Sequence, residues 1–228
     1  MTDVATYNEG WISVGVSCDE VACLPAAWTS LDGVTWERRW LGETNARPAS
    51  VAVFDGVLIA VGHAYLNNSA VAAVWTSSDG VEWLRVEHDP LLFGTGQPTG
   101  ELWDVTMTSV AYVCFEQSRC EFTAVGWTIS DSSGQNGEQR ARIWSSSDGF
   151  TWTVFFDAPS EGVAWDVATN GDVIVATGTA IWRSDDGTTW VQVAPGGSQT
   201  SNAIAVGPSY WVSIPGYGDD VWVSPPAD

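Results

Sequence analysis

Two matching tryptophan–aspartate strings carry the residues of this 228-residue chain that could do chemistry. They are Trp103-Asp104-Val105 and Trp165-Asp166-Val167. A carboxylate beside an indole ring can bind a cation, or it can hold sugar hydroxyls while the sugar ring stacks on the indole. Two carboxylates about 5–10 Å apart would also meet the general requirement for glycoside hydrolysis. Which chemistry applies depends on the elements that position these residues.

The four cysteines form two local pairs, Cys18 with Cys23 and Cys114 with Cys120. Neither pair has the spacing of a zinc knuckle, and His63 and His88 lie far from both along the chain. We therefore predict disulfides Cys18–Cys23 and Cys114–Cys120, with four buried free thiols as the alternative. Disulfides favour an extracellular or cell-surface protein whose signal segment is absent from this chain, and a cytoplasmic location is the alternative.

A repeated string indicates the elements that hold these residues. The pattern Trp-x-Ser-x-Asp-Gly-x-x-Trp begins at Trp28, Trp75, Trp144 and Trp182, and a degenerate copy begins at Trp222. An Asp-Gly pair between two β-prone stretches is a strong hairpin signal, because glycine supplies the positive φ of the turn. The residues predicted to build these turns are Ser30, Asp32, Gly33 and Trp36; Ser77, Asp79, Gly80 and Trp83; Ser146, Asp148, Gly149 and Trp152; and Ser184, Asp186, Gly187 and Trp190.

The string resembles the Asp-box, or BNR-like repeat, whose common pattern is Ser-x-Asp-x-Gly-x-Thr-Trp. The copies in this chain are one residue shorter between Asp and Trp. The resemblance implies a β-propeller in which the box is a structural turn between the third and fourth strands of a blade, away from the ligand face. It implies no catalytic role for the four box aspartates. Asp-boxes occur in sialidases, other glycosidases, sorting receptors and assembly factors, so the resemblance does not select a function.

The repeat predicts an all-β fold, a single β-propeller domain of about five four-stranded blades spanning residues 1–228. Successive first tryptophans lie 47, 69, 38 and 40 residues apart, close to the length of one blade with an insertion in the third. The expected blades are 1–42, 43–94, 95–157, 158–194 and 195–228. Pro225 and Pro226 cannot donate to a strand ladder, so either the last blade has three strands or the chain is part of a longer propeller.

Aligning the blades places one small polar residue at the start of each inner strand. These residues are Asp3, Ser50, Asp104, Asp166 and Asn202. We expect them to ring the mouth of the central channel and, with Trp103 and Trp165, to form a site for a cation such as calcium or for a polyol. The alternative is that they cap the inner strands and bind water. The polar stretch from Ser130 to Arg142 is the second candidate site.

The charge balance limits the partners. With 28 acidic and 8 basic residues the formal net charge is −20, which repels nucleic acid and anionic membrane surfaces and favours cations and basic partners. No apolar run reaches the roughly 20 residues needed to span a bilayer, so no membrane insertion is expected. The sequence does not indicate an oligomeric state, and it names no certain cofactor.

Two classes of function fit these features. The first is a non-enzymatic extracellular binding or scaffold propeller that recognises a glycan or a protein on the loop face around the channel. The alternative is a sialidase-like or other glycoside hydrolase that uses carboxylates at the channel mouth. Most of the arginines lie in or beside predicted third and fourth strands, and the Arg-Ile-Pro string of sialidases is absent, which disfavours the sialidase version.

Overall fold

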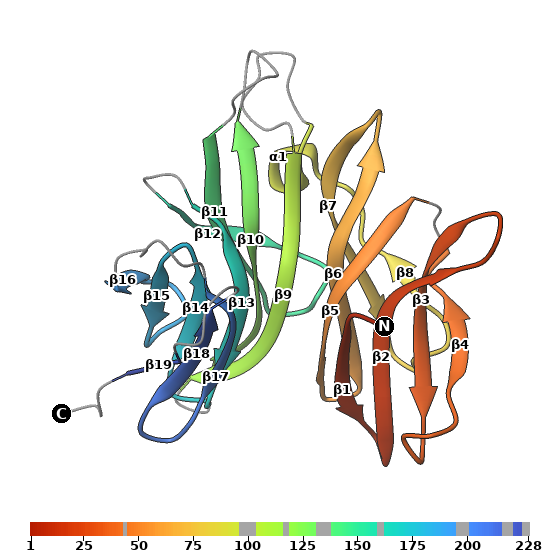
Figure 1. Ribbon diagram of the computed structural model, residues 1–228, viewed down its shortest axis with the longest axis horizontal. Coiled ribbons are helices and arrows are strands. Elements are labelled where there is room, and N and C mark those ends of the chain that lie inside the picture. Colours follow the sequence, from red (N-terminus) through yellow and green to blue (C-terminus); the bar gives the residue numbers. More distant parts are fainter. Residues whose placement is uncertain are drawn as a thin grey trace.

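Five antiparallel sheets make up the protein (Figure 1). The computed structural model describes residues 1–42, 45–95, 104–115, 119–130, 138–158, 162–194, 201–215 and 221–224. In this part of the chain, four sheets have four strands and one has three. This confirms the predicted all-β propeller of five blades, and the described part of the last blade has three strands. Pro225 and Pro226 lie outside the described residues.

Each blade consists of consecutive strands that pair with their neighbours in chain order. Blade 1 comprises β1 (Asp3–Tyr7), β2 (Gly10–Cys18), β3 (Cys23–Ser30) and β4 (Glu37–Trp40). Blade 2 comprises β5 (Ala46–Phe54), β6 (Val57–Leu66), β7 (Ser69–Ser77) and β8 (Leu84–Arg85). Blade 3 comprises β9 (Asp104–Phe115), β10 (Arg119–Ser130), β11 (Glu138–Ser146) and β12 (Thr153–Asp157). Blade 4 comprises β13 (Ala164–Thr169), β14 (Ile174–Gly178), β15 (Ile181–Ser184) and β16 (Val191–Ala194). Blade 5 comprises β17 (Ser201–Val206), β18 (Trp211–Pro215) and β19 (Trp222–Val223).

Helix is almost absent from the described residues. A four-residue turn of helix, α1 (Pro90–Phe93), follows blade 2 and is capped by the Asp89 side chain. No helix in the described ranges has the length and apolar character needed to cross a membrane.

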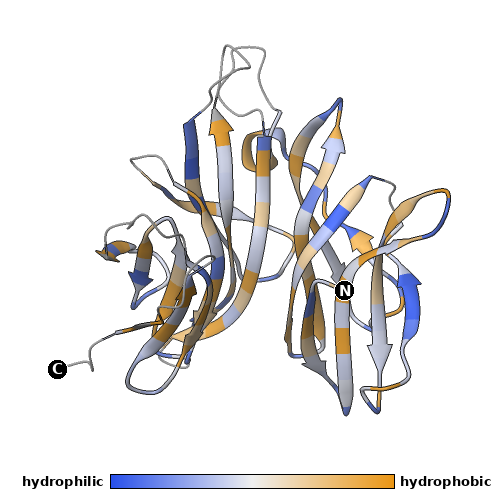
Figure 2. Cartoon of the chain, viewed as in Figure 1, coloured by the Kyte–Doolittle hydropathy of each residue, from blue (hydrophilic) through white to orange (hydrophobic). Residues whose placement is uncertain are grey.

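Apolar side chains between neighbouring blades form the core. The inner strands β1, β5, β9, β13 and β17 lie beside one another in chain order, and hydrophobic residues recur along the strands of every sheet (Figure 2). Each of the three large interfaces contains the first tryptophan of one copy of the repeated string. These residues are Trp75 between blades 1 and 2, Trp144 between blades 2 and 3, and Trp182 between blades 3 and 4. These three tryptophans are therefore packing residues.

In the part of the chain that the structure describes, the ring is open between blades 5 and 1. No strand of blade 5 makes an extended contact with a strand of blade 1 in the described part of the chain, and the two blades stand apart in Figure 1. The consequence is visible at equivalent positions. Val51 in blade 2 is 4% exposed, whereas Val4 in blade 1 is 55% exposed. Blade 1 thus presents to solvent a face that the other blades bury.

The predicted Asp-Gly turn is present in all four complete copies of the string. In each copy the serine Oγ accepts a hydrogen bond from the glycine amide, at 2.8–2.9 Å. The aspartate Oδ1 accepts from the two amides that follow the glycine. The four glycines have φ between 71° and 78°, which a side chain would strain. Each turn joins the third and fourth strands of its blade and is built from groups that satisfy one another.

These turns make stability depend on pH. The amides of Thr35 and Val34 lower the pKa of Asp32 to about 2, and the amides of Glu82 and Val81 lower the pKa of Asp79. Because the unfolded aspartate pKa is about 3.9, the folded state binds fewer protons in this range. The stabilisation is present above about pH 4 and is lost as pH falls toward about 2.

We expect replacement of the four box aspartates by asparagine to flatten the dependence of the melting temperature on pH between about pH 4 and 2. Asparagine retains an acceptor oxygen for the turn amides but does not titrate. The comparison with the parent removes the contribution of the remaining acids, which both proteins share. If the melting temperature of the fourfold variant depends on pH as steeply as that of the parent, the box aspartates are not the origin of this pH dependence.

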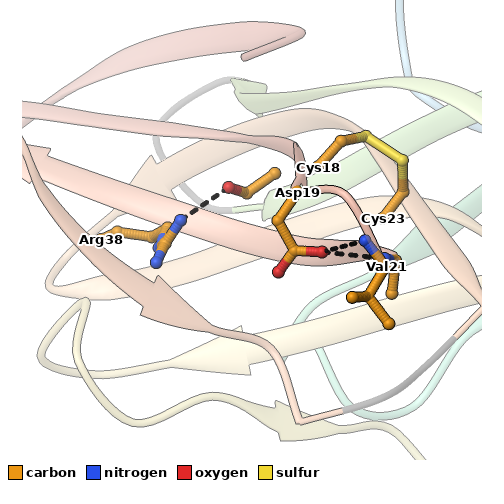
Figure 3. The surroundings of a disulfide bond; sticks show 7 residues. Cys18, Asp19, Val21, Cys23 and Arg38 are labelled. Atoms are coloured by element: carbon orange, nitrogen blue, oxygen red, sulfur yellow. Dashed lines mark hydrogen bonds between the residues drawn. A yellow bond between two sulfur atoms is a disulfide. The ribbon is translucent and has the colours of Figure 1, made fainter.

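Both predicted disulfides are present, Cys18–Cys23 and Cys114–Cys120. Each joins two residues that are register partners at the end of a hairpin. In Figure 3 the short loop inside the first pair is closed by Asp19, whose Oδ1 accepts from the amides of Val21 and Ala22. Disulfides persist in oxidising compartments, so these pairs are typical of an extracellular protein.

Candidate functional site

Inner strands of neighbouring blades are joined by hydrogen bonds from one repeated position. In blade 1, Asp3 Oδ2 accepts from Ser50 Oγ at 2.7 Å and from the Val51 amide at 2.9 Å, both in blade 2. Ser50 Oγ in turn accepts from the Val110 amide of blade 3 at 3.3 Å. We call these contacts the interblade clamps.

Asp166 is the central member of the clamps on the other side of the ring. Its Oδ1 accepts from Ser109 Oγ of blade 3 at 2.7 Å and from the Val167 amide at 2.9 Å. Its Oδ2 accepts from the Ile204 amide of blade 5 at 2.9 Å. Both carboxylate oxygens therefore serve to join blades 3, 4 and 5.

The strand register corrects the sequence alignment in two blades. In blades 1, 2 and 4 the clamp residue pairs with the residue that directly precedes the glycine of the second strand; the clamp residues are Asp3, Ser50 and Asp166. In blade 3 the residue before this glycine is Val125, and it pairs with Ser109 instead of Asp104. The alignment was wrong because β9 begins five residues before the clamp position, at Asp104. In blade 5 the equivalent residue is Ala203, which pairs with Ile214, so Asn202 was placed one residue too early.

A second repeated position, directly before each clamp residue, faces the centre of the ring. In blades 2 to 5 the inner strand shifts register here by one extra residue, a β-bulge. The opposing glycines Gly62, Gly126 and Gly178 allow the close approach, because a Cβ there would lie 1.8–2.1 Å from a carbonyl oxygen in the inner strand or directly before it. The residues of this position in blades 1 to 5 are Thr2, Ala49, Thr108, Trp165 and Asn202.

All five of these residues line one central cavity of about 830 Å³. Its remaining lining comes from blades 2 and 3. The residues are His63, Tyr65, Ala70, Asp104, Thr106, Met107 and Trp127. The cavity thus combines three aromatic rings with one carboxylate, one imidazole and one carboxamide.

Asp104 and His63 are the titratable pair of the cavity wall. Asp104 Oδ1 accepts from the Ala70 amide at 2.9 Å, a contact that joins blade 3 to blade 2. Burial lowers the pKa of His63, the positive charge of Arg47 lowers it further, and Asp104 acts in the opposite direction. His63 is therefore neutral at pH 7, and its ring stands edge-on to Tyr65 at 5.3 Å.

Two polar atoms of the wall have no protein partner within the described ranges. They are His63 Nδ1 and Trp127 Nε1, and both are buried. Buried donors and acceptors are normally satisfied by protein, water or ligand. These atoms are suited to hydrogen bonds with a molecule in the cavity.

The structure divides the predicted site residues into two groups. Asp104, Trp165 and Asn202 line the cavity, whereas Asp3, Ser50 and Asp166 form the clamps and are absent from its lining. Trp103 lies outside the described residues. Of the stretch Ser130–Arg142, residues 131–137 also lie outside them, and the end belongs to β11. The described ranges contain no cluster of three or more His, Cys, Asp or Glu side chains that could hold a metal ion.

Trp127 is not among the site residues predicted from the sequence, and neither are His63 and Tyr65. Both lie in β6, which runs to Leu66. The signal that could have found His63 and Trp127 is their position in the repeat. His63 follows Gly62 and Trp127 follows Gly126, so both occupy the residue after the glycine of a second strand.

Comparisons with known proteins identify the fold. No family model matches the sequence, and no curated protein matches it. Among solved structures, an α-L-arabinanase of Penicillium chrysogenum complexed with arabinobiose is similar at a TM-score of 0.56 and 14% identity, over 94% of this chain and 70% of that one. A thermostable family-43 glycoside hydrolase is similar at 0.54 and 11% identity, over 98% and 92%.

A GH32 β-fructofuranosidase of Bombyx mori, in complex with sucrose, is similar at a TM-score of 0.51 and 12% identity, over 94% of this chain. The chain spans about half the length of that enzyme, 53%. At these identities the likeness concerns the backbone arrangement alone. The chain therefore shares the β-propeller fold of these glycoside hydrolases.

Proposed function

We propose that the central cavity binds a carbohydrate. The observation that carries the proposal is the lining itself, in which Tyr65, Trp127 and Trp165 surround the same space as the Asp104 carboxylate. Sugar rings present apolar faces that stack on aromatic side chains, and their hydroxyls need hydrogen-bond partners. A cavity of about 830 Å³ lies within the range of small-molecule sites. Solved structures with this fold, described with arabinobiose and with sucrose, support the same ligand class.

Whether the bound sugar is also hydrolysed separates two finer proposals. The glycoside-hydrolase alternative is favoured by the comparisons, because each similar structure named above is a glycoside hydrolase. Hydrolysis needs two carboxyl groups about 5–10 Å apart. The described lining contains one, Asp104, and both oxygens of Asp166 are held in the clamps. Hydrolysis would thus require a second acid beyond the described lining.

Two further assignments accompany this proposal. We infer that the chain is an Asp-box-type propeller, since each of the four turns joins the third and fourth strands of its blade, as the resemblance implies. We also infer an extracellular location, which the two disulfides support. A protein ligand remains the other partner class for the loop face.

The test is a calorimetric titration with arabinobiose, sucrose and a panel of disaccharides, followed by product analysis of the same samples. We expect Trp165→Ala to weaken binding about fivefold or more, because one aromatic contact contributes about 1 kcal/mol. Trp11→Ala is the matched control, since Trp11 is 38% exposed and Trp165 is 37% exposed, but Trp11 is not among the lining residues. A parent protein that binds no sugar, or equal effects of the two variants, would contradict the proposal. Released monosaccharide would establish hydrolysis.

A further inference from the structure

The cavity contains a negative charge that nothing in its described lining neutralises. Asp104 is the single formally charged side chain among the lining residues, and no arginine in the described ranges forms an ion pair with it. One oxygen accepts from the Ala70 amide, which stabilises the charge without cancelling it. A half-buried carboxylate of this kind gains most from a cation placed against it.

The neighbouring basic groups do not supply that cation. His63 is neutral at pH 7, because burial and the charge of Arg47 both lower its pKa. Arg47 is exposed and is not one of the lining residues. The only other titratable lining group is the Tyr65 phenol.

The aromatic residues of the cavity favour the same kind of ligand. Trp127, Trp165 and Tyr65 line the space that Asp104 faces. The face of an aromatic ring attracts ammonium groups, tryptophan most strongly, and aromatic cages recognise cationic ligands in this way. The net charge of −20 adds a long-range field that attracts cations and repels acidic sugars.

We propose that the cavity selects sugars that carry a free ammonium group, with that group bound between the Asp104 carboxylate and the aromatic rings. This inference rests on the proposed carbohydrate site and names its ligand class. The ammonium would donate hydrogen bonds to the Asp104 oxygens, while the sugar ring stacks on an indole. An N-acetylated sugar has the same ring without the charge, and a uronic acid would meet repulsion from Asp104.

The test compares four ligands that share one ring and differ in charge. The disaccharide of glucosamine, its N-acetylated form, cellobiose and a glucuronic acid disaccharide are titrated calorimetrically at a pH where the amine is protonated. We expect the glucosamine disaccharide to bind at least about tenfold more tightly than the two neutral ones, since a desolvated cation–π contact and a charge-assisted hydrogen bond together supply that factor. The preference should weaken with added salt.

Asp104→Asn should abolish the preference, so that the charged and the neutral disaccharides bind with similar affinity. Glu20→Gln, which removes one negative charge from the exposed β2–β3 turn, is the control and should leave the preference intact. Equal affinity for charged and neutral sugars, or a preference that survives Asp104→Asn, would overturn this inference and leave the carbohydrate site standing. Absence of binding by all four ligands and by the disaccharide panel would overturn both.

Discussion

Replacing Trp75 by alanine is expected to lower the free energy of unfolding by about 3–5 kcal/mol, and replacing Trp28 should cost clearly less. The two residues occupy the same position of the repeated string, in blades 2 and 1. Trp75 is fully buried, packs with Ile12 and Val14 of blade 1, and has the Arg85 guanidinium 5.0 Å from its ring centre. Trp28 is half-buried, because within the described residues no strand of another blade makes an extended contact with its side of the sheet.

Denaturant unfolding of the two variants measures this difference, with Trp144→Ala as a second buried reference. Trp144 is also fully buried, so it should behave like Trp75. If Trp28→Ala costs as much as Trp75→Ala, the outer face of blade 1 must be covered in solution. The open arrangement of the ring would then be wrong for the protein in solution, and blade 5 or another partner would complete it.

The open ring has a basis in the sequence that becomes readable only with the strand register. Clamp residues of blades 1, 2 and 4 supply an oxygen that accepts from the inner strand of the next blade. Blade 5 has Ala203 at this position, and its methyl side chain has no acceptor for an amide of blade 1. The amide of Val4 is instead bonded by Asp3 of its own blade. The clamp that joins successive blades is therefore not encoded between the last blade and the first.

Features that depend on local patterns could be predicted from the sequence. The blades, the four turns and both disulfide pairs follow from residues close together in the chain, and all are found in the structure. The cavity lining depends on register. Because one extra residue moves the following side chains to the other face of a strand, the bulge decides which residues face the centre. Trp165 and Asp166 are adjacent, yet only Trp165 lines the cavity.

The matched strings around Asp104 and Asp166 were misleading for the same reason. Their letters agree, but Asp104 begins a strand of twelve residues and Asp166 is the third residue of a strand of six. Because the inner strand of blade 3 is long, Asp104 lies five residues before the clamp position, which Ser109 occupies. Two aspartates with the same neighbours thus have different tasks, and their variants should differ accordingly.

Asp166→Ala is expected to lower the free energy of unfolding by about 3–5 kcal/mol and to leave sugar affinity of the folded protein unchanged. Three donors from three blades, Ser109 Oγ and the amides of Val167 and Ile204, would lose their acceptor. A hydrogen bond to a charged group contributes about 1.5–3 kcal/mol, and part of this loss is recovered where water can enter. Asp166→Asn should lie between the parent and the alanine variant, because it keeps one acceptor oxygen.

Asp104→Ala is the paired variant and should show the reverse pattern. Its carboxylate accepts one amide hydrogen bond, from Ala70, so stability should fall by only about 1–3 kcal/mol while sugar binding weakens. Denaturant unfolding and calorimetric titration of both proteins, below their melting temperatures, separate the two effects. A stable Asp166→Ala protein that no longer binds sugar would show that Asp166 contacts the ligand. Because the clamps use both oxygens of Asp166, we expect its loss to loosen blades 3, 4 and 5, whereas loss of Asp104 removes the charge from the cavity.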